Sequence, residues 1–274
     1  KARASAAARP LPRPRLAIGL SGGGDSTALL LASAEVYPDV DRVALIVDHG
    51  LRAHSRAEAE AAADAARAAG ARARILSWSA PRPGQAHARA ARHRLLAQAA
   101  RAEGASVLAL AHTLEDRIET LRMRAARSGP ELRMAGPRRL DPAPVWPEGC
   151  GLMIARPFLD IRREALRAYL ETAGVRWIED PSNNDLAFER VRLRRAPLSA
   201  ADAAALLRRS DAAAAERDRL HRAALALIDA AAQPLAWGGA ILDAPLFAQA
   251  GVPVALKALE TLVLAASGAG TPPD

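Results

Sequence analysis

Residues 21–26 read Ser-Gly-Gly-Gly-Asp-Ser and lie between an apolar run, Leu16–Leu20, and a helix-forming run that starts at Thr27. A strand, a glycine turn and a helix start in this order gather backbone N–H groups around one small volume, which is typical of a phosphate site. Three glycines allow close approach of an anion, and Ser21, Ser26 and Thr27 add hydroxyl donors. The sequence therefore predicts an α/β fold built around a phosphate-binding turn; the alternative is a glycine turn without a ligand.

The predicted phosphate site differs from the common lysine-containing nucleotide loop. No lysine follows the glycines, and lysine occurs in this chain only at positions 1 and 257. The G-x-x-x-x-G-K-[ST] loop, which holds β- and γ-phosphates with a lysine, is therefore excluded. Backbone N–H groups and hydroxyls must hold the anion instead.

Strand-like and helical runs alternate through the first part of the chain. The apolar strand-like runs are Leu16–Leu20, Val43–Val47, Arg72–Leu76 and Ser106–Ala111, and the helical runs between them are Thr27–Val36, Ser55–Ala69 and Gln85–Glu103. This order predicts right-handed crossovers and a Rossmann-like parallel sheet covered on both faces. Ligands of such sheets bind beyond the carboxyl ends of the strands. We therefore expect Ser21, Asp48 and His112, which follow predicted strands directly, to converge at that edge.

The rest of the chain predicts one more strand and helix and then a change of character. Residues 128–150 carry five prolines and read as a loop, followed by a strand over Met153–Arg156 and a helix over Arg162–Ala173. Residues 200–232 are almost all helix-forming, and shorter helices are expected after them. We therefore expect a basic N-terminal arm over 1–15, an α/β domain over 16–197 and a smaller helical domain over 198–274.

Positive charge is concentrated in a few places. The net charge is +8, but residues 1–15 hold five basic residues and no acid, so overall basicity overstates the case for nucleic acid. Local clusters carry that case instead. Seven arginines lie between Arg117 and Arg139 against two acids, and four lie between Arg190 and Arg195. A solvated helix face is the alternative interpretation of each cluster.

Cysteine content and hydropathy exclude some classes of protein. Cys150 is the only cysteine, which excludes a disulfide framework or a cysteine-held iron–sulfur cluster within one chain. No apolar run approaches 18 residues, so we expect no membrane-spanning helix. The N-terminal segment is more typical of an arm than of a secretory signal, and we expect a cytoplasmic protein.

Four short motifs follow one another along the chain. The first is the Ser21–Ser26 turn, and the second is Asp48-His49-Gly50-Leu51-Arg52 followed by Ser55. The third runs from Ala111-His112 to Glu119-Thr120, and the fourth is Asp180-Pro181-Ser182-Asn183-Asn184-Asp185 with Phe188, Arg190 and Arg194. Together they resemble the motifs of the tRNA(Ile)-lysidine synthases, a family of the N-type ATP-pyrophosphatase-loop (PP-loop) group. The whole group shares the first motif, and the second is narrower. The third is similar to the family's A-H-H-x-D-D-Q-x-E-T, and the fourth, the most specific, is similar to D-P-S-N-x-D…F-x-R-N-x-x-R.

This chain departs from the family pattern at several positions. Thr113, Glu115 and Arg117 stand where the family usually has His, Asp and Gln. Val191 replaces an Asn, His93 replaces a frequent Tyr, and Arg127-Ser128-Gly129 is one residue shorter than the family's R-G-S-G. None of these changes removes an acid that the chemistry needs, but Thr113 and Glu115 bear on the fine geometry around the substrate.

The resemblance implies an adenine nucleotide α-hydrolase-like fold and a two-step ligation with ATP and Mg²⁺. The O2 atom of a cytidine in the CAU anticodon of tRNA(Ile) attacks the α-phosphate of ATP and expels pyrophosphate. The ε-amine of free L-lysine then attacks C2 of the adenylated cytidine, and AMP leaves. The implied partners are this tRNA and lysine, with no membrane; the oligomeric state stays open, with a homodimer as one candidate.

The same resemblance suggests roles for individual residues. ATP is expected on Ser21, Gly22, Gly23, Gly24, Asp25 and Ser26, with Asp25 as the metal carboxylate; helix capping is its alternative role. Asp116 and Glu119, spaced i, i+3 on one helix face, suit the ammonium group of lysine. Pairing with Arg122 and Arg124 is their alternative. His112 is expected to position ATP or act as a base, or else to be structural.

Arginines are the candidates for binding phosphate and RNA. Guanidinium forks suit phosphate, so Arg190 and Arg194 are expected at the α-phosphate or the tRNA backbone. Arg122, Arg124 and Arg127 lie beside the acids and are expected to hold the tRNA backbone. Aromatic residues are only 3% of the chain, so hydrogen bonds rather than stacking must recognise the splayed anticodon bases.

Three other functions compete with this interpretation. A carbonyl-adenylating synthetase of the same group would not need the Asp180–Asp185 motif or the arginine clusters. A tRNA thiolation enzyme of the group generally needs several cysteines. A non-catalytic tRNA-binding protein would need no phosphate turn. ATP–pyrophosphate exchange with and without tRNA distinguishes these functions.

Overall fold

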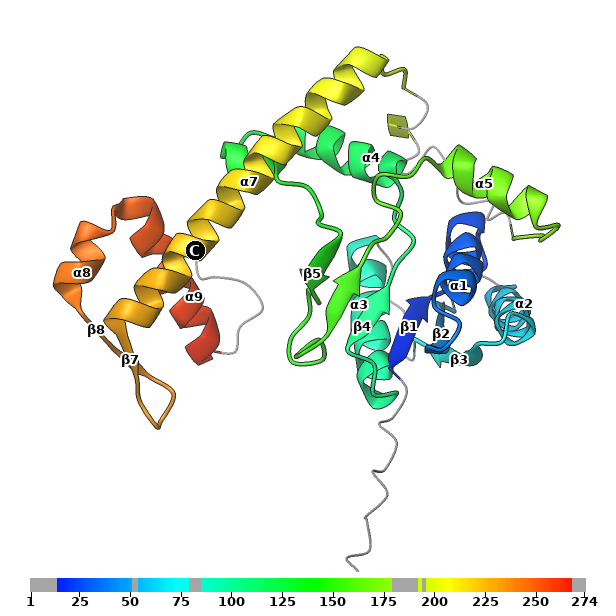
Figure 1. The fold of residues 1–274 in the computed structure, drawn as a ribbon, viewed down its shortest axis with the longest axis horizontal. Helices are drawn as coiled ribbons and strands as arrows, with labels where there is room; N and C mark the ends of the chain where they lie inside the picture. Colours follow the sequence, from blue (N-terminus) through cyan, green and yellow to red (C-terminus); the bar gives the residue numbers. More distant parts are fainter. Residues whose placement is uncertain (1–13, 51–53, 79–84, 179–191, 194–195, 268–274) are drawn as a thin grey trace, which may run out of the picture.

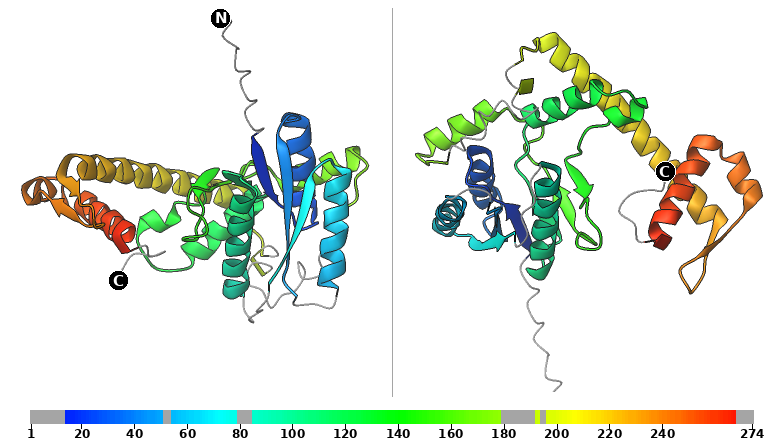
Figure 2. Two further views of the ribbon diagram at one scale, coloured as in Figure 1. Left: turned by 90° about the horizontal axis from the view of Figure 1, so that it is seen from below. Right: turned by 180° about the vertical axis from the view of Figure 1, so that it is seen from behind.

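The computed structural model describes residues 14–50, 54–78, 85–178, 192–193 and 196–267. The chain forms a six-stranded sheet with helices, and a long helix leads away from the sheet to a two-stranded hairpin and two further helices (Figure 1). Views from below and from behind agree that this C-terminal group lies at the far end of the long helix from the sheet (Figure 2). Among the described residues, no helix is both long enough and apolar enough to cross a membrane.

The first half of the fold follows the alternation that the sequence predicts, with bounds shifted by a few residues. Its elements are β1 (Arg15–Gly19), α1 (Gly24–Val36), β2 (Asp41–Asp48), α2 (Ser55–Ala68), β3 (Arg72–Ser77), α3 (Gln85–Ala102), β4 (Val107–Ala109) and α4 (Leu114–Ala125). Gly70 and Gly104, just beyond α2 and α3, have φ of 74°. This left-handed conformation ends helices and favours glycine, as the sequence suggested.

The second half departs from the prediction at residues 128–150, which were expected to be a loop. This segment forms a 3₁₀ turn, η1 (Glu131–Met134), and an edge strand, β5 (Leu140–Pro142), that pairs antiparallel with β6 (Met153–Ala155). Proline is tolerated in β5 because an edge strand leaves one side of its backbone unpaired. The prolines therefore led to the prediction of a loop where a short strand forms. This strand depends on its pairing with β6.

A helix and a C-terminal group complete the molecule. They are α5 (Arg163–Thr172), α7 (Ala200–Ala231), β7 (Ala232–Pro234), β8 (Ala240–Leu242), α8 (Ala244–Gln249) and α9 (Val252–Ser267). The predicted long helix over 200–232 is confirmed as α7. The β7–β8 hairpin was not predicted, because each of its strands has only three residues.

Strand order places the functional edge of the sheet. The order is β3-β2-β1-β4-β6-β5, with every neighbouring pair parallel except β5 and β6. The chain runs outward in one direction from β1 to β3 and then returns to the other side of β1 with β4. Ligand sites of open α/β sheets form at this switch point, outside the carboxyl ends of the strands. The segments after β1 and β4, which carry Ser21 and His112, therefore lie side by side.

Alternate residues of the central strands form cores on the two faces of the sheet. Ala17, Val43 and Leu45 pack with Leu96 and Ala100 of α3 on one face. On the other face, Ile18, Ala44 and Ile46 pack against α1 and the small alanine face of α2, which is formed by Ala59, Ala62, Ala63 and Ala66. Both faces are thus covered by helices, as the sequence predicted, and the strand carboxyl ends are held rigidly.

The long helix α7 joins the sheet region to the C-terminal group. Its first half packs Ala213, Leu206 and Leu207 against Leu121 of α4 and Met134 of η1. Its second half packs Ala224 and Ala231 against Phe247 of α8 and Ala258 of α9. The whole of α7 follows the domain boundary that we predict near residue 198. Its first half nevertheless packs against the α/β region, and its second half packs against the C-terminal group.

Candidate functional site

The glycine turn after β1 is closed by its own hydrogen bonds. Ser21 N–H donates to Ser26 Oγ at 3.1 Å, and Ser26 Oγ–H donates to the carbonyl of Gly23 at 2.9 Å. Gly22 has φ of 80°, and α1 begins at Gly24. The turn therefore presents backbone N–H groups and the N-terminus of a thirteen-residue helix at the switch point, which is the arrangement that binds phosphate.

Trp177 and Ile178, which are far along the chain, contact this turn. The N–H of Ile178 donates to the Gly22 carbonyl at 2.9 Å. A Cβ added at Gly22 would lie 2.8 Å from Ile178 Cδ1, and one added at Gly24 would lie 3.3 Å from the Trp177 ring. A side chain is therefore disfavoured at Gly22 by its positive φ and by Ile178, and it would be crowded by Trp177 at Gly24. The sequence did not identify Trp177 and Ile178, because only the tertiary fold brings them to the turn.

The most specific motif begins at Asp180, two residues after Ile178. Asp180–Asp185, Phe188, Arg190 and Arg194 all lie outside the described residues. The same holds for Leu51 and Arg52 of the second motif. That motif's Asp48 ends β2 and accepts the Gly50 N–H at 3.0 Å. The pKa of Asp48 is lowered mainly by a hydrogen bond from Ser55 and to a smaller extent by the bond from Gly50.

Asp25, Asp116 and an arginine meet beside the glycine turn. Asp25 is in the first turn of α1, and its Oδ2 accepts from Arg163 Nε at 2.9 Å. Arg163 Nη2 lies 3.4 Å from both carboxylate oxygens of Asp116 and 3.3 Å from Thr113 Oγ1. The structure thus brings together the two acids that the sequence predicted for ATP and for lysine. Arg163 was missed, because a single arginine at a helix start carries no distinctive signal.

Thr113 explains how α4 presents its acids. It is the N-cap of α4, and its N–H and hydroxyl both donate to Asp116 Oδ2, at 2.9 and 3.0 Å. This reciprocal capping arrangement fixes the start of the helix and the orientation of the Asp116 carboxylate. Thr113 therefore has a clear local function at a position where it departs from the family pattern.

Electrostatics distinguish the two aspartates. Burial is the largest influence on Asp25 and raises its pKa, against the opposing charge of Arg163. Burial also disfavours the Asp116 carboxylate, but the Thr113 N–H bond and the charge of Arg163 outweigh it and lower the pKa. The pKa of Asp116 is therefore lowered and that of Asp25 raised, although Arg163 contacts both carboxylates.

The two glutamates of α4 have different surroundings. Glu119 is only 4% exposed and is the buried acid predicted to bind lysine. Its negative charge contributes to the raised pKa of Arg163. Glu115 Oε2 accepts the backbone N–H of Arg163 at 2.9 Å, at the first turn of α5. A carboxylate at a helix N-terminus is stabilising, so Glu115 joins α4 to α5.

Three arginines lie close enough to His112 to affect its pKa. Burial, with the charges of Arg156, Arg92 and Arg89, lowers the pKa of His112 to about 4, although Asp116 opposes the shift. The buried Nδ1 of His112 has no hydrogen-bond partner among the described residues. Burial and the same arginines also lower the pKa of His93, which replaces the family's tyrosine, to about 4. His112 is therefore neutral at physiological pH and has an unused ring nitrogen.

Most of the arginine cluster between Arg117 and Arg139 is occupied in intramolecular contacts. Arg117 pairs with Asp160 and Asp211, Arg138 pairs with Asp218, and Arg139 pairs with Asp160. Arg122 donates to the carbonyls of Leu193 and Ala196. The cluster is therefore mainly a scaffold that holds α7 and the segment before it against the sheet region.

A smaller basic pocket remains in this region. Arg124, Arg127 and Arg133, with Leu132, line a hollow of about 300 Å³ beside α4 and η1. Arg124 also donates to the carbonyls of Arg133 and Ala135, so part of its role is structural. Of the three predicted tRNA-binding residues, Arg124 and Arg127 thus line one pocket, whereas Arg122 binds backbone elsewhere.

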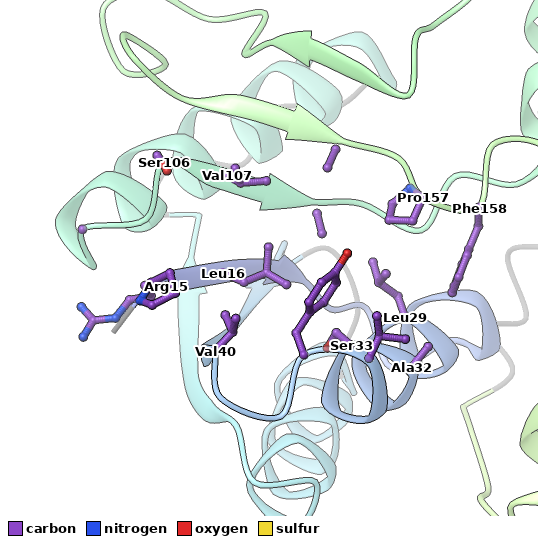
Figure 3. A pocket seen from close by; sticks show the side chains of 16 residues that line it. Arg15, Leu16, Leu29, Ala32, Ser33, Val40, Ser106, Val107, Pro157 and Phe158 are labelled. Atoms are coloured by element: carbon purple, nitrogen blue, oxygen red, sulfur yellow. The ribbon is translucent and has the colours of Figure 1, made fainter. Parts of the chain in front are cut away.

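A larger apolar groove, of about 880 Å³, lies away from these polar groups. It is formed by the second half of α1 together with β4, the start of β1 and the segment after β6, and Figure 3 shows Leu16, Leu29, Val107 and Phe158 around it. Asp25, His112, Asp116 and Glu119 do not line it. The groove is thus separate from the candidate site.

Comparisons with known proteins agree with this geometry. The PP-loop domain family matches residues 1–200. A U34-tRNA thiolase with a [4Fe-4S] cluster, NcsA from Methanococcus maripaludis, shares the fold with a TM-score of 0.56, at 17% identity over 66% of this chain and 64% of that one. Sheet order, glycine turn and family match together define a PP-loop protein.

Relatives found by sequence show which family of PP-loop proteins this chain resembles. Proteins named tRNA(Ile)-lysidine synthase from Hyphomonas neptunium and Caulobacter vibrioides are each 46% identical, over 65% and 68% of this chain and 49% and 46% of their own lengths. One from Methylobacterium nodulans is 40% identical over 97% of this chain and 84% of its own length. This chain belongs to the tRNA(Ile)-lysidine synthase family. It spans about half the length of the first two relatives.

Proposed function

We propose that this protein ligates free L-lysine to C2 of the wobble cytidine in a CAU-anticodon tRNA(Ile), with ATP consumed to AMP and pyrophosphate. One observation carries the proposal. Asp25 beside the glycine turn and Asp116 of α4 meet at one edge of the sheet, where Arg163 contacts both, and the buried Glu119 follows on α4. A nucleotide site and an ammonium site so close together suit an enzyme that first adenylates its substrate and then displaces AMP with an amine.

In the first step, the turn over Ser21–Ser26 holds the phosphates of ATP with backbone N–H groups and hydroxyls. The cytidine O2 attacks the α-phosphate, and pyrophosphate leaves. We assign Arg190 and Arg194 to the charge that develops on phosphate, because guanidinium forks match its oxygens. This assignment follows from their place in the specific motif.

Magnesium fits the residues around the turn. Mg²⁺ commonly takes one or two protein carboxylates and completes its shell with substrate phosphates and water. Among the described residues, no group of three or more His, Cys, Asp or Glu side chains could hold a metal. Asp25 is the carboxylate inside the turn. It would hold the ion together with ATP, and the ion would neutralise charge on the leaving pyrophosphate.

In the second step, Asp116 and Glu119 hold the lysine ammonium group, and the amine attacks C2 of the adenylated cytidine as AMP leaves. The ammonium must lose one proton before its nitrogen can attack, and AMP leaves with the electrons of the C2–O bond as the C–N bond forms. We assign the acceptance of that proton to His112, which is neutral and has a buried nitrogen that lacks a partner among the described residues. The arginine pocket on α4 and η1 would take tRNA phosphates, and the cytoplasm is the compartment where tRNA, ATP and lysine meet.

Labelled lysine provides the test. With Mg²⁺ and ATP, the purified protein should incorporate lysine into a tRNA whose anticodon reads CAU and not into the same tRNA with another anticodon. Pyrophosphate release should require the CAU tRNA but not lysine. Pyrophosphate exchange that needs a carboxylic acid and no tRNA would instead indicate a carbonyl-adenylating synthetase, and tRNA binding without pyrophosphate release would indicate a non-catalytic protein.

A further inference from the structure

Arg163 occupies an unusual position between the two halves of the proposed site. Its Nε is 2.9 Å from Asp25 Oδ2, and its Nη2 is 3.4 Å from Asp116. The three side chains are 18–26% exposed. Asp25 is on α1 and Asp116 is on α4, so one guanidinium joins two elements that meet only in the tertiary structure.

Arg163 is the first residue of α5, which contacts both of these elements. Its N–H donates to Glu115 Oε2 on α4 at 2.9 Å. On the other side, Leu166 and Leu170 of α5 pack against Ala28 of α1 in a buried cluster. The arginine therefore projects from a fixed point, and its planar fork sets the relative positions of the two carboxylates.

The charge of Arg163 is needed where it lies. Asp25, Glu115, Asp116 and Glu119 place four acids within one small region, and like charges that are partly removed from water repel one another. A single charged group without a fork, such as a lysine ammonium, has no fixed geometry that reaches both aspartates at once. The shape of the guanidinium is thus as important here as its charge.

We propose that Arg163 is a positioning residue that couples the nucleotide and lysine halves of the site by holding Asp25 and Asp116 in register. The lysine half of this inference rests on the proposed function; the nucleotide half does not. It follows that substitution of Arg163 should impair the binding of two chemically different substrates. A simple loss of folded protein would reduce only the amount of active enzyme.

Two substitutions separate charge from shape. Arg163→Met removes both, and we expect the dissociation constants of Mg–ATP and of L-lysine each to rise at least tenfold in calorimetry on the full chain. Arg163→Lys keeps a charge that can serve Asp25. It should restore Mg–ATP affinity to within about threefold of wild type while lysine affinity stays at least tenfold weaker. Arg162→Met, which removes the exposed neighbour at the α5 N-cap, should change neither constant.

The outcomes are distinguishable. If Arg163→Met and Arg163→Lys lower the melting temperature or the maximal rate but leave both dissociation constants at wild-type values, Arg163 is only structural and the inference is wrong. Equal restoration of both affinities by Arg163→Lys would also overturn it, because shape would then not matter. If wild-type protein does not incorporate lysine into tRNA, the proposed function fails. The Mg–ATP measurements then still decide whether Arg163 positions Asp25.

Discussion

At the residue scale, the glycines of the phosphate turn are not equivalent. Gly22 has φ of 80°, and its added Cβ would meet Ile178 Cδ1 at 2.8 Å, whereas the nearest atom to a Cβ at Gly23 is 3.5 Å away. Gly22→Ala should therefore lower the free energy of unfolding by about 1–3 kcal/mol through backbone strain and crowding. Gly23→Ala is the matched control and should unfold within about 0.5 kcal/mol of wild type in urea. Equal stabilities for the two variants would contradict this account of the turn.

Glu119 offers a test of which substrate the α4 acids bind. Glu119→Gln keeps the size of this buried side chain and removes its charge. A charge-assisted hydrogen bond is worth about 1.5–3 kcal/mol, so the Michaelis constant for lysine should rise roughly ten- to over a hundredfold while tRNA-dependent pyrophosphate release continues. Glu171→Gln, an exposed acid in the last turn of α5, serves as a control that should leave the lysine constant unchanged. Loss of pyrophosphate release with lysine affinity intact would place Glu119 on the nucleotide side.

His93 should make folding sensitive to acid. Burial on α3, near Arg89, Arg92 and Arg156, lowers its pKa from 6.5 to about 4 in the folded protein. Between these values the unfolded chain binds a proton that the folded chain does not, so stability falls as pH drops from about 6.5 to about 4. His93→Gln should flatten this part of the unfolding-versus-pH curve, measured by thermal melting. The exposed His87→Gln on the same helix is the control, and an identical slope in both variants would refute the assignment.

At the scale of elements, α4 and η1 carry the basic pocket. The test uses Arg127 and Arg133, which line this pocket; Arg133 also donates to the Ser128 carbonyl at 2.9 Å, and Arg124 donates to two carbonyls. Replacing both with Ala should weaken tRNA binding and reduce the slope of log affinity against log salt by about 0.7–0.9 for each tRNA phosphate that the variant no longer neutralises. Arg67→Ala, an exposed arginine on α2, removes charge elsewhere and should leave the slope unchanged. An unchanged slope in the double variant would move the RNA surface, most simply to the C-terminal helices.

At the scale of the whole molecule, α7 determines how the C-terminal group is attached. Ala213 is 5% exposed where α7 packs against Leu121 and Met134. Ala213→Asp would bury an unpaired charge, and we expect a loss of about 3 kcal/mol or more, or separation of one unfolding transition into two. Ala215→Asp, on the exposed side of the same helix, is the control. If both variants melt like wild type, α7 does not depend on this contact.

The sequence by itself determined most of the order of helices and strands, and its resemblance to a known family predicted the residues of the site. Glycines between an apolar run and a helix start define the phosphate turn locally. Period and composition likewise define β1 to α4 and the long α7, because each depends on neighbours in the chain. The acids at positions 25, 116 and 119 were predicted from the resemblance to a known family together with their spacing, and their roles stay a prediction.

Only the tertiary structure decided which distant groups meet. Arg163 reaches Asp25 across 138 positions of sequence, Trp177 and Ile178 support the glycine turn, and β5 exists as a strand because β6 lies beside it. The arginine cluster looked like a basic face, but Asp160, Asp211 and Asp218 neutralise much of it. Such contacts leave no periodic pattern in the chain, because a hydrogen bond or ion pair between remote residues requires only that the fold place two atoms within reach.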